Sequence, residues 1–436
     1  MAEGINTRDL VLSMLIEINE NGQYSHLLLR QVLEKYQYLD RQERAFITRL
    51  TEGTLERLLE LDFIIDAFSK TKVRKMKPLI RNLLRMSAYQ LKYMDAIPDS
   101  AVCNEAVKLA KKHGFGPLSG FVNGVLRNMA RQLETVAYPD PKKNLYAYLS
   151  VTYSMPEWIL KKWIADYGKE KTMEILTAFS GEYPLTIRTN TTQITPEALK
   201  QKLEAEGVSV SPVEGLSYAF AIEGFDYLNA LESFAAGDFY VQDVSSMMVA
   251  EAADPQKGDF IIDVCAAPGG KASHLAEKLE GSGMVEARDL TDYKVGLIEE
   301  NILRHGLTNM KACRRDALVR DEASVEKADI VICDLPCSGL GVMGKKTDLR
   351  YKTSLQKTEE LADLQRRMLD TCAAYVRRGG KLIYSTCTIN RAENEENVSW
   401  FLKAHPEFGL IMQRQIFPGE AGSDGFFLAR LEKSGE

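Results

Sequence analysis

The chain has 436 residues, and its 61 acidic and 55 basic side chains leave a formal net charge of −6. With 45% hydrophobic and 27% charged residues it has the composition of a folded globular protein, which disfavours a disordered or fibrous chain. At roughly 150 residues per domain, this length suggests about three domains. No apolar run approaches the ~20 residues of a membrane span, and the start MAEGINTRDL lacks the layout of a secretory signal. We therefore expect a cytoplasmic protein.

Seven cysteines are spread over the chain, an odd number for a set of disulfides. No CxxC pair occurs, and the five histidines offer no zinc-ligand spacing. We therefore expect reduced thiols and no metal site. Five of the seven cysteines, all except Cys103 and Cys372, lie from Cys265 to Cys387 at the ends of predicted strands or in loops. Their positions are therefore more informative than their number.

Residues 1–138 are predicted to form an all-α bundle. Apolar residues recur there at helical spacing, and the alternation that marks strands is scarce. A clear example of this spacing is Leu83, Leu84, Ala88 and Leu91. A further helix is expected to begin after Pro98 and to end near Gly114.

The charge of this bundle is uneven, because the sequence between Asp66 and Asp95 holds eight basic residues and no acidic one. These residues are Lys70, Lys72, Arg74, Lys75, Lys77, Arg81, Arg85 and Lys92. Most such runs are solvated helix faces. An acidic protein that binds nucleic acid must, however, concentrate its positive charge locally. A solvated face and a phosphate-binding patch both stay open at this point.

Residues 139–235 are predicted to form a small α/β linking module. The Tyr-Pro-Asp-Pro stretch at 138–141 is typical of a linker. Strand-like stretches follow at 184–188, 208–213 and 218–222, with helical patterns before and between them. No motif in this module indicates chemistry.

Residues 236–436 are predicted to form an α/β domain in which short apolar strands alternate with helices. The expected strands are Phe260–Val264, Met284–Arg288, Met310–Arg314, Ala328–Cys333 and Lys381–Ser385. The expected helices lie near 272–280, 292–305, 355–376 and 393–403. This alternation is typical of βαβ units on a mostly parallel sheet, whose ligands bind beyond the carboxyl ends of the strands. The residues directly after each strand are therefore the candidates for function.

A loop of small residues follows the first expected strand. It consists of Cys265, Ala266, Ala267, Pro268, Gly269, Gly270 and then Lys271. Such residues let the backbone pass close to a ligand and turn into a helix N-terminus, but the loop matches neither dinucleotide nor nucleotide-triphosphate fingerprints. Asp289 and Asp316 follow the second and third strands. Because an acid after the second strand binds ribose hydroxyls in related sheets, the pattern favours an adenosine-containing ligand without a polyphosphate.

Two cysteines follow the fourth and fifth strands, Cys337 within DLPCSG at 334–339 and Cys387 within STCT at 385–388. A cysteine is usually a small buried hydrophobe. We expect this of Cys103, Cys313, Cys333 and Cys372. Cys337 and Cys387 fit that interpretation poorly, because turn and polar residues surround both at the edge where ligands bind.

These motifs resemble the signature of S-adenosylmethionine-dependent RNA cytosine-5 methyltransferases. They are CAAPGGK at Cys265–Lys271, DLPCSG at Asp334–Gly339, STC at Ser385–Cys387, Asn390, and Glu393-Asn394-Glu395. Residues 81–132 resemble the RNA-binding antitermination factor NusB. A NusB-like domain before such a catalytic domain is similar to the bacterial enzymes that methylate cytosine in 16S rRNA. The resemblance implies an RNA-binding NusB-like bundle at 1–138 and a Rossmann-like methyltransferase domain at 236–436.

The resemblance also implies roles in catalysis on a 16S rRNA substrate. Spacing alone leaves the nucleophile open, because DNA enzymes of this chemistry use a Pro-Cys pair, such as Pro336-Cys337 here. In the RNA enzymes the equivalent of Cys387 attacks the base and the equivalent of Cys337 assists product release. Asp334 would bond the N3/N4 edge of the base, and Lys271 would line the same pocket.

The same resemblance implies S-adenosylmethionine as the cofactor. The loop from Cys265 to Lys271 would hold its methionine part, with Asp289 at the ribose and Asp316 at the adenine, and Asp334 would lie beside it. Four basic residues after a glycine-rich stretch are candidates either for RNA backbone contact or for a solvated loop. They are Lys345, Lys346, Arg350 and Lys352.

Two alternatives remain. An amino-methylating enzyme on this scaffold would place an aromatic residue where Cys337 stands, which argues against it. A non-catalytic RNA-binding assembly factor could retain the fold, although two rim cysteines and an intact Asp-x-Pro-Cys sequence disfavour it.

Overall fold

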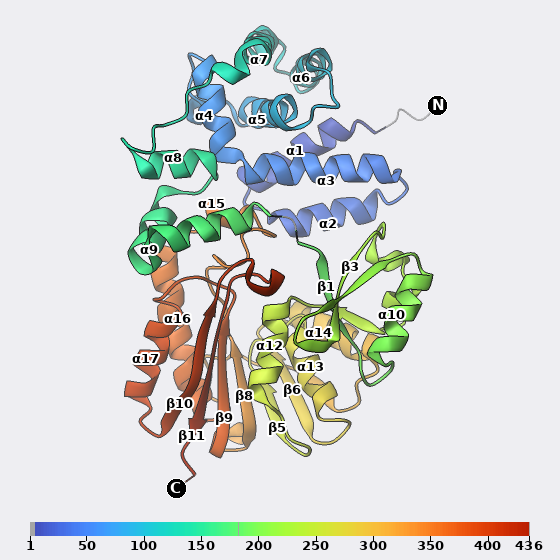
Figure 1. Ribbon diagram of the computed structural model, residues 1–436, viewed down its shortest axis with the longest axis vertical. Coiled ribbons are helices and arrows are strands. Elements are labelled where there is room, and N and C mark those ends of the chain that lie inside the picture. The colour runs from blue at the N-terminus through green and yellow to red at the C-terminus, as the bar shows by residue number, and fades with distance from the viewer. Residues whose placement is uncertain (1–4, 182, 436) are drawn as a thin grey trace. The chain divides into compact units, whose positions relative to one another are not determined.

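The computed structural model describes residues 5–181 and 183–435 (Figure 1). The chain forms two compact units. The first comprises the chain up to Leu176 together with Lys345–Lys352, and the second comprises Thr177–Gly344 and the chain from Thr353 onward. The division of the sequence at 138 and 235 into three domains stays a prediction.

The first unit is a bundle of helices, as predicted from the apolar periodicity. Its helices are α1 (Thr7–Asn19), α2 (Ser25–Lys35), α3 (Arg41–Glu56), α4 (Leu58–Phe68), α5 (Pro78–Tyr93), α6 (Asp99–Lys112), α7 (Ser119–Gln132), α8 (Leu145–Thr152), the greater part of α9 (Glu157–Phe179) and α15 (Leu349–Lys352). Helix α5 packs against α1, α3, α4, α6 and α7, so Leu83, Leu84 and Ala88 lie in the core. Helix α6 begins directly after Pro98, and Gly114 takes a φ of +83° just beyond its end, as expected of a helix stop.

A small antiparallel sheet begins the second unit. Its strands are β1 (Leu185–Thr189), β2 (Ser209–Val213), β3 (Leu216–Glu223) and β4 (Phe239–Val241), in the order β2-β3-β1-β4. Helix α10 (Pro196–Ala205) covers it with Leu199 and Leu203. Fully buried Arg188 of β1 donates to Gln242 and pairs with Glu277 of α13 (Gly270–Lys278), which fastens this sheet to the larger one.

The larger sheet has seven strands in the order β10-β11-β9-β8-β5-β6-β7. The parallel ones are β5 (Phe260–Asp263), β6 (Met284–Asp289), β7 (Met310–Arg314), β8 (Ala328–Asp334) and β9 (Val376–Thr386). The chain builds β5, β6 and β7 outward in one direction and then returns to place β8 and β9 on the other side of β5. The predicted Rossmann-like arrangement is thereby confirmed, with its topological switch point between β5 and β8.

Helices cover both faces of this sheet (Figure 1). One apolar core includes side chains of α16 (Leu355–Ala373) and α17 (Glu395–Ala404). The other includes side chains of α12 (Val244–Ala253), α13 and α14 (Asp292–His305). Burial on both faces explains why the central strands β5 and β8 are short, nearly continuous apolar runs.

Several details of the second unit differ from the sequence prediction, which also missed β4 and α12. Helix α16 ends at Ala373 and strand β9 already begins at Val376, so a helix as far as Val376 was wrong by one short turn. The antiparallel strands β10 (Phe408–Ile416) and β11 (Phe426–Lys433) were not predicted. Strand β10 is an edge strand whose middle residues are mostly exposed, so it lacks the apolar run by which the parallel strands were found.

Within the described residues, every helix is too short or too polar to cross a bilayer.

Candidate functional site

Two thiols meet at the carboxyl end of the large sheet. Cys337 lies three residues beyond β8, and Cys387 directly follows β9. Because β8 and β9 are parallel neighbours, the loops that follow them leave the same edge of the sheet. The two Sγ atoms lie 3.4 Å apart, within hydrogen-bond reach of each other, and both cysteines are reduced. The fold thus brings into contact two sulfurs that lie fifty positions apart in the sequence.

An ion pair stands beside these thiols. Lys271, at the start of α13, donates from Nζ to Oδ2 of Asp334 at 2.7 Å, and the hydroxyl of Ser385 donates to Oδ1 of the same carboxylate at 2.8 Å. Burial alone would lower the pKa of Lys271, but the Asp334 carboxylate and the nearby Cys387 sulfur raise it. The ammonium therefore keeps its charge next to Cys387.

The two sulfurs lie in different electrostatic surroundings. The hydrogen bond with Cys387, burial and the charge of the Glu393 carboxyl hold the pKa of Cys337 well above its usual value. Lys271 acts on Cys387 in the opposite sense, because a neighbouring cation favours a thiolate and a neighbouring anion disfavours it.

A buried polar network holds the two cysteine loops together. The Ser338 hydroxyl lies 2.7 Å from the Thr388 hydroxyl, which joins the residue after each cysteine. Both Ser338 and Asn390 donate to the carboxylate of Glu393, which is fully buried. Asn390 and Glu393 belong to the motif found in the sequence, but the sequence alone indicated no role for them. Their position in the structure shows that they connect the two cysteine loops.

The small-residue loop makes the turn from β5 into α13. Gly269 takes a φ of +112°, a backbone conformation in which other residues are strained, directly before the helix begins. The loop is tied to the end of β6, since the N–H of Ala266 donates to Arg288 O at 2.8 Å and that of Ala267 to Oδ2 of Asp289 at 3.2 Å. A Cβ at Gly270 would meet no atom within 4 Å, so the backbone is open on that side.

The candidate acids follow neighbouring strands, as predicted. Asp289, which is buried, receives the N–H of Leu290 at 2.7 Å and pairs with Lys294 at 3.0 Å. Asp316 follows β7 and receives the N–H of Leu318 at 2.9 Å. The structure thus places the loop, both acids, the ion pair and both thiols along one edge of the sheet.

Sequence reasoning gave no role to Asp263, the last residue of β5. Its Oδ1 accepts the N–H of Cys265 at 3.3 Å, and its Oδ2 is a buried oxygen without a hydrogen-bond partner. Burial, with a smaller contribution from the charge of Asp334, raises its pKa to about 7, although Lys271 opposes this. The sequence does contain a signal for Asp263, because it is an acidic residue at the end of the apolar strand β5.

Asp263→Asn should change the pH dependence of stability. The folded protein keeps a proton on Asp263 that the unfolded chain loses near pH 4, so this group's contribution is fully present below about pH 4 and is lost as the pH rises through about 7. The asparagine variant avoids this loss. Relative to the wild type, its free energy of unfolding should increase by about 4 kcal/mol between about pH 4 and pH 8. Urea unfolding across that range measures the difference, and parallel curves for the two proteins would contradict the assignment.

The basic residues after the glycine-rich stretch are not arranged as expected. Arg350 is 2% exposed and its guanidinium donates to the backbone oxygens of Tyr153 and Ser154 at 3.3 and 3.5 Å. Lys352 pairs with buried Asp348 at 2.8 Å. For Arg350 both expectations, RNA contact and a solvated loop, were therefore wrong. The reason is that its segment belongs to the first unit and bonds within it. Lys352 lies in the short helix α15 and not in a loop, but its side chain stays partly exposed, so its RNA contact remains a prediction.

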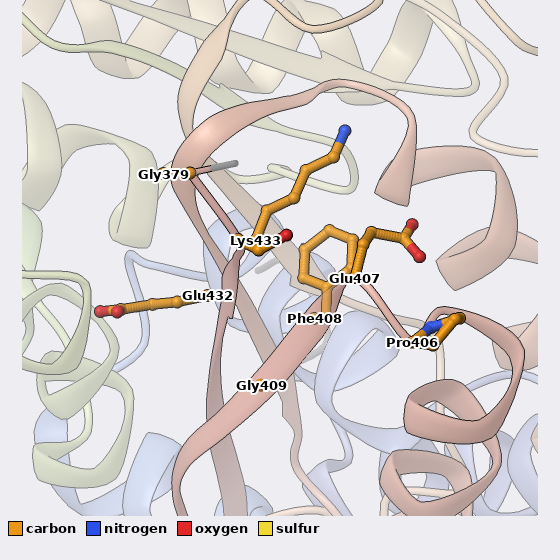
Figure 2. A pocket seen from close by; sticks show the side chains of 9 residues that line it. Gly379, Pro406, Glu407, Phe408, Gly409, Glu432 and Lys433 are labelled. Atoms are coloured by element: carbon orange, nitrogen blue, oxygen red, sulfur yellow. The ribbon is translucent and has the colours of Figure 1, made fainter.

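A surface hollow lies at the other end of the sheet (Figure 2). Its lining includes Gly379 near the start of β9, Phe408 at the start of β10 and Lys433 at the end of β11. Because β9 runs from there to Thr386, directly before Cys387, a strand's length separates this hollow from the thiols. Among the described residues, no group of His, Cys, Asp and Glu side chains could hold a metal ion.

Comparison with known proteins places this site in a family. Residues 250–432 match the 16S rRNA methyltransferase RsmB/F family, residues 5–131 match the NusB family, and residues 155–225 match a ferredoxin-like domain of RsmF/B-like methyltransferases. The chain is 36% identical, over 99% of both chains, to a probable ribosomal RNA small subunit methyltransferase B of Bacillus subtilis. The chain belongs to the small subunit rRNA methyltransferase B family. The family resemblance found in the sequence is thereby confirmed.

Other members of the RsmB/F family and solved structures agree with this placement. The ribosomal RNA small subunit methyltransferase B of Vibrio cholerae is 29% identical over 98% of both chains. The crystal structure of a methyltransferase homolog protein from Pyrococcus horikoshii covers 66% of this chain and 99% of its own, with a TM-score of 0.60 and 25% identity. Another crystal structure, also 25% identical, covers 99% of this chain and 100% of its own with a TM-score of 0.85.

Proposed function

We propose that this RsmB/F-family protein transfers a methyl group from S-adenosylmethionine to carbon 5 of a cytosine in 16S rRNA, through a covalent bond between Cys387 and carbon 6. The observation that supports it most strongly is the 3.4 Å separation of the two sulfurs beside a lysine–aspartate ion pair. Two thiols this close can both reach the same ring. One can attack while the other exchanges a proton.

The chemistry requires such an arrangement. Carbon 5 of cytosine is too weak a nucleophile to attack a methyl sulfonium unaided. The Cys387 thiolate adds to carbon 6, which moves electron density to carbon 5, and carbon 5 then takes the methyl group as the bond from sulfur to methyl breaks. A base removes the carbon 5 proton, and the Cys387–carbon 6 bond breaks with its electron pair returning to sulfur. The ring is restored and one proton is released overall.

The ion pair supplies the groups that hold the base. A carboxylate paired with Lys271 accepts hydrogen bonds, so Asp334 suits the exocyclic N4 amino group of cytosine. The Lys271 ammonium is a donor suited to N3, where charge builds up after attack. A base that reaches these groups must leave its stack, as it does in other enzymes that modify bases. Lys271 thus serves twice, because it also favours the thiolate of Cys387.

The residues proposed to bind S-adenosylmethionine lie at the carboxyl ends of the parallel strands. The backbone of Cys265–Gly270, with Lys271 beyond it, would hold the methionine part at the open side of Gly270, and Asp334 would border it. Asp289 would accept the ribose hydroxyls and Asp316 the adenine amino group. S-adenosylmethionine supplies an electrophilic methyl group when bound there.

A methylation assay tests the proposed function. The protein is incubated with 16S rRNA that lacks its modifications and with methyl-labelled S-adenosylmethionine, and the RNA is digested to nucleosides. We expect the label in 5-methylcytidine. Label in N4-methylcytidine would instead identify the amino-methylating alternative. RNA binding without any label would identify the non-catalytic assembly factor.

The first unit, with its NusB-like region, is proposed to bind the RNA backbone through part of the basic run. Three of the eight cations are occupied by acids inside the bundle: Arg81 with Glu20, Arg85 with Asp62 and Lys92 with Glu60. The other five lie exposed around the short helix η1 (Val73–Lys75), where Lys72 also pairs with Asp66 at 3.6 Å and buried Val73 and Met76 anchor the segment. These five are Lys70, Lys72, Arg74, Lys75 and Lys77.

Removing two of these charges should weaken RNA binding and its salt dependence together. The double variant Arg74→Ala/Lys75→Ala should lower the slope of log K against log salt by about 1.4, since each phosphate contact on a single strand contributes about 0.7. The matched control, Lys161→Ala/Lys257→Ala, removes the same charge from exposed positions elsewhere. Filter binding across a salt series measures both slopes. Equal slopes would contradict the assignment.

A further inference from the structure

Glu393 is the centre of the polar network beneath the two thiols. Its carboxyl is fully buried. It receives the backbone N–H of Ser338 at 2.8 Å, the Ser338 hydroxyl, the side-chain amide of Asn390 at 2.7 Å and that of Gln365 at 3.0 Å. These donors come from three segments, namely the loop after β8, the loop after β9 and helix α16. One carboxylate therefore joins three parts of the chain that are far apart in sequence.

The hydrogen bonds between Glu393 and Ser338 connect the carboxylate to the residues that follow the two cysteines. Ser338 directly follows Cys337. The hydroxyl of Ser338 also meets the Thr388 hydroxyl, and Thr388 directly follows Cys387. Thr388 Oγ1 accepts the N–H of Leu340 at 3.3 Å, and Cys387 O accepts that of Gly341 at 3.1 Å. The path from the carboxylate thus runs through Ser338 to Cys337, and through Ser338 and Thr388 to Cys387.

We propose that Glu393 is a positioning residue for the methyl transfer: it fixes the loops of Cys337 and Cys387 so that both sulfurs face one cytosine at once. This inference rests on the proposed function. Glu393 itself does not touch the reacting atoms. It acts through Ser338, Thr388 and Asn390.

The hydrogen bonds of Glu393 require both of its carboxylate oxygens to be acceptors. A buried carboxylate is costly, and burial raises the pKa of Glu393 while the bonds from Ser338, Asn390 and Gln365 oppose that rise. Four donors converge on two acceptor oxygens. Glutamine has the same shape but replaces one oxygen with an NH₂ group, so a donor would face a donor in a buried site. At least one of the three segments must then move away.

Glu393→Gln tests this inference against a matched control. Glu286 of β6 is also a buried carboxyl, but its partners are Arg288 and Lys311, and it bonds to neither cysteine loop. At equal folded fraction we expect Glu393→Gln to lower kcat at least about 100-fold relative to Glu286→Gln, with KM for S-adenosylmethionine within about twofold of the wild type. Ser338→Ala, which removes only the hydroxyl link, should lose less.

A second measurement reports the sulfur spacing without RNA. Phenylarsine oxide forms two As–S bonds and releases water where two thiols lie close together, and the intact mass of the protein shows the product. The wild type should be bridged, Cys337→Ala gives the background from other cysteines, and Glu393→Gln should be bridged at least about tenfold more slowly than Glu286→Gln. Equal bridging or equal kcat in the two glutamine variants would overturn the inference. A wild type that is bridged but makes no 5-methylcytidine would instead overturn the proposed function.

Discussion

Cys387→Ala is expected to lower the rate of methyl transfer at least about 1000-fold, because the variant lacks the sulfur that the proposed function assigns to the attack on carbon 6. Binding of S-adenosylmethionine should stay within about twofold of the wild type, since the thiol acts on the base and not on the cofactor. Incorporation of labelled methyl into 16S rRNA and equilibrium binding of the cofactor measure the two quantities. The expectation rests on the position of Cys387, which shares the field of the Lys271 ammonium.

The matched control is Cys333→Ala. Cys333 is a fully buried cysteine on β8 that packs in the apolar core. Its loss should lower stability and leave the rate per folded molecule unchanged. Substantial turnover by Cys387→Ala would show that Cys337 is the nucleophile, as in the DNA enzymes with a Pro-Cys pair.

Cys337→Ala is expected to accumulate a covalent protein–RNA complex. Attack by Cys387 needs only the neighbouring Lys271 and the base, both of which this variant retains. Release needs a proton exchange that the Cys337 thiol, 3.4 Å from the Cys387 sulfur, is placed to assist. The raised pKa of Cys337 keeps that proton available at neutral pH. A slowly migrating RNA-linked band should appear on a denaturing gel, and turnover should fall at least about 100-fold.

The double variant Cys337→Ala/Cys387→Ala provides the control for this experiment. It should give no linked species, because the sulfur that forms the bond is absent. If Cys337→Ala alone gives no linked species while it binds RNA normally, the division of labour between the two thiols is wrong.

The sequence predicted the parallel strands of the catalytic domain correctly where both faces of a strand are buried. The parallel strands inside the sheet are largely buried on both faces, unlike β7 at its edge, so their apolar stretches stand out and their ends can be located within a residue or two. The residues after these ends, among them Asp289, Cys337 and Cys387, were therefore found as candidates. Strand β10 escaped because an exposed edge strand mixes polar and apolar side chains. Strand β11, which lies buried between β10 and β9, was missed although it contains an apolar stretch.

The basic run shows a different limit of the sequence. The sequence pattern does not distinguish Arg81 from Lys75, since both are basic residues in one charged stretch. In the structure, however, Arg81 pairs with Glu20 and Lys75 is exposed. Glu20 lies 61 positions away in the chain, so no local pattern indicates the pairing. The same holds for Arg350, which looked like a surface cation and is buried by its bonds to Tyr153 and Ser154.

The sequence by itself determined which residue types follow each strand, and with them the family and the two candidate thiols. That information is local, because a strand and the loop after it are continuous in the chain. Only the tertiary structure decided that the two sulfurs touch, that Lys271 stands on the side of Cys387, and that Glu393 lies under both loops. Those relations depend on which strands become neighbours, and the pairing of β8 with β9 is settled by packing across the whole sheet.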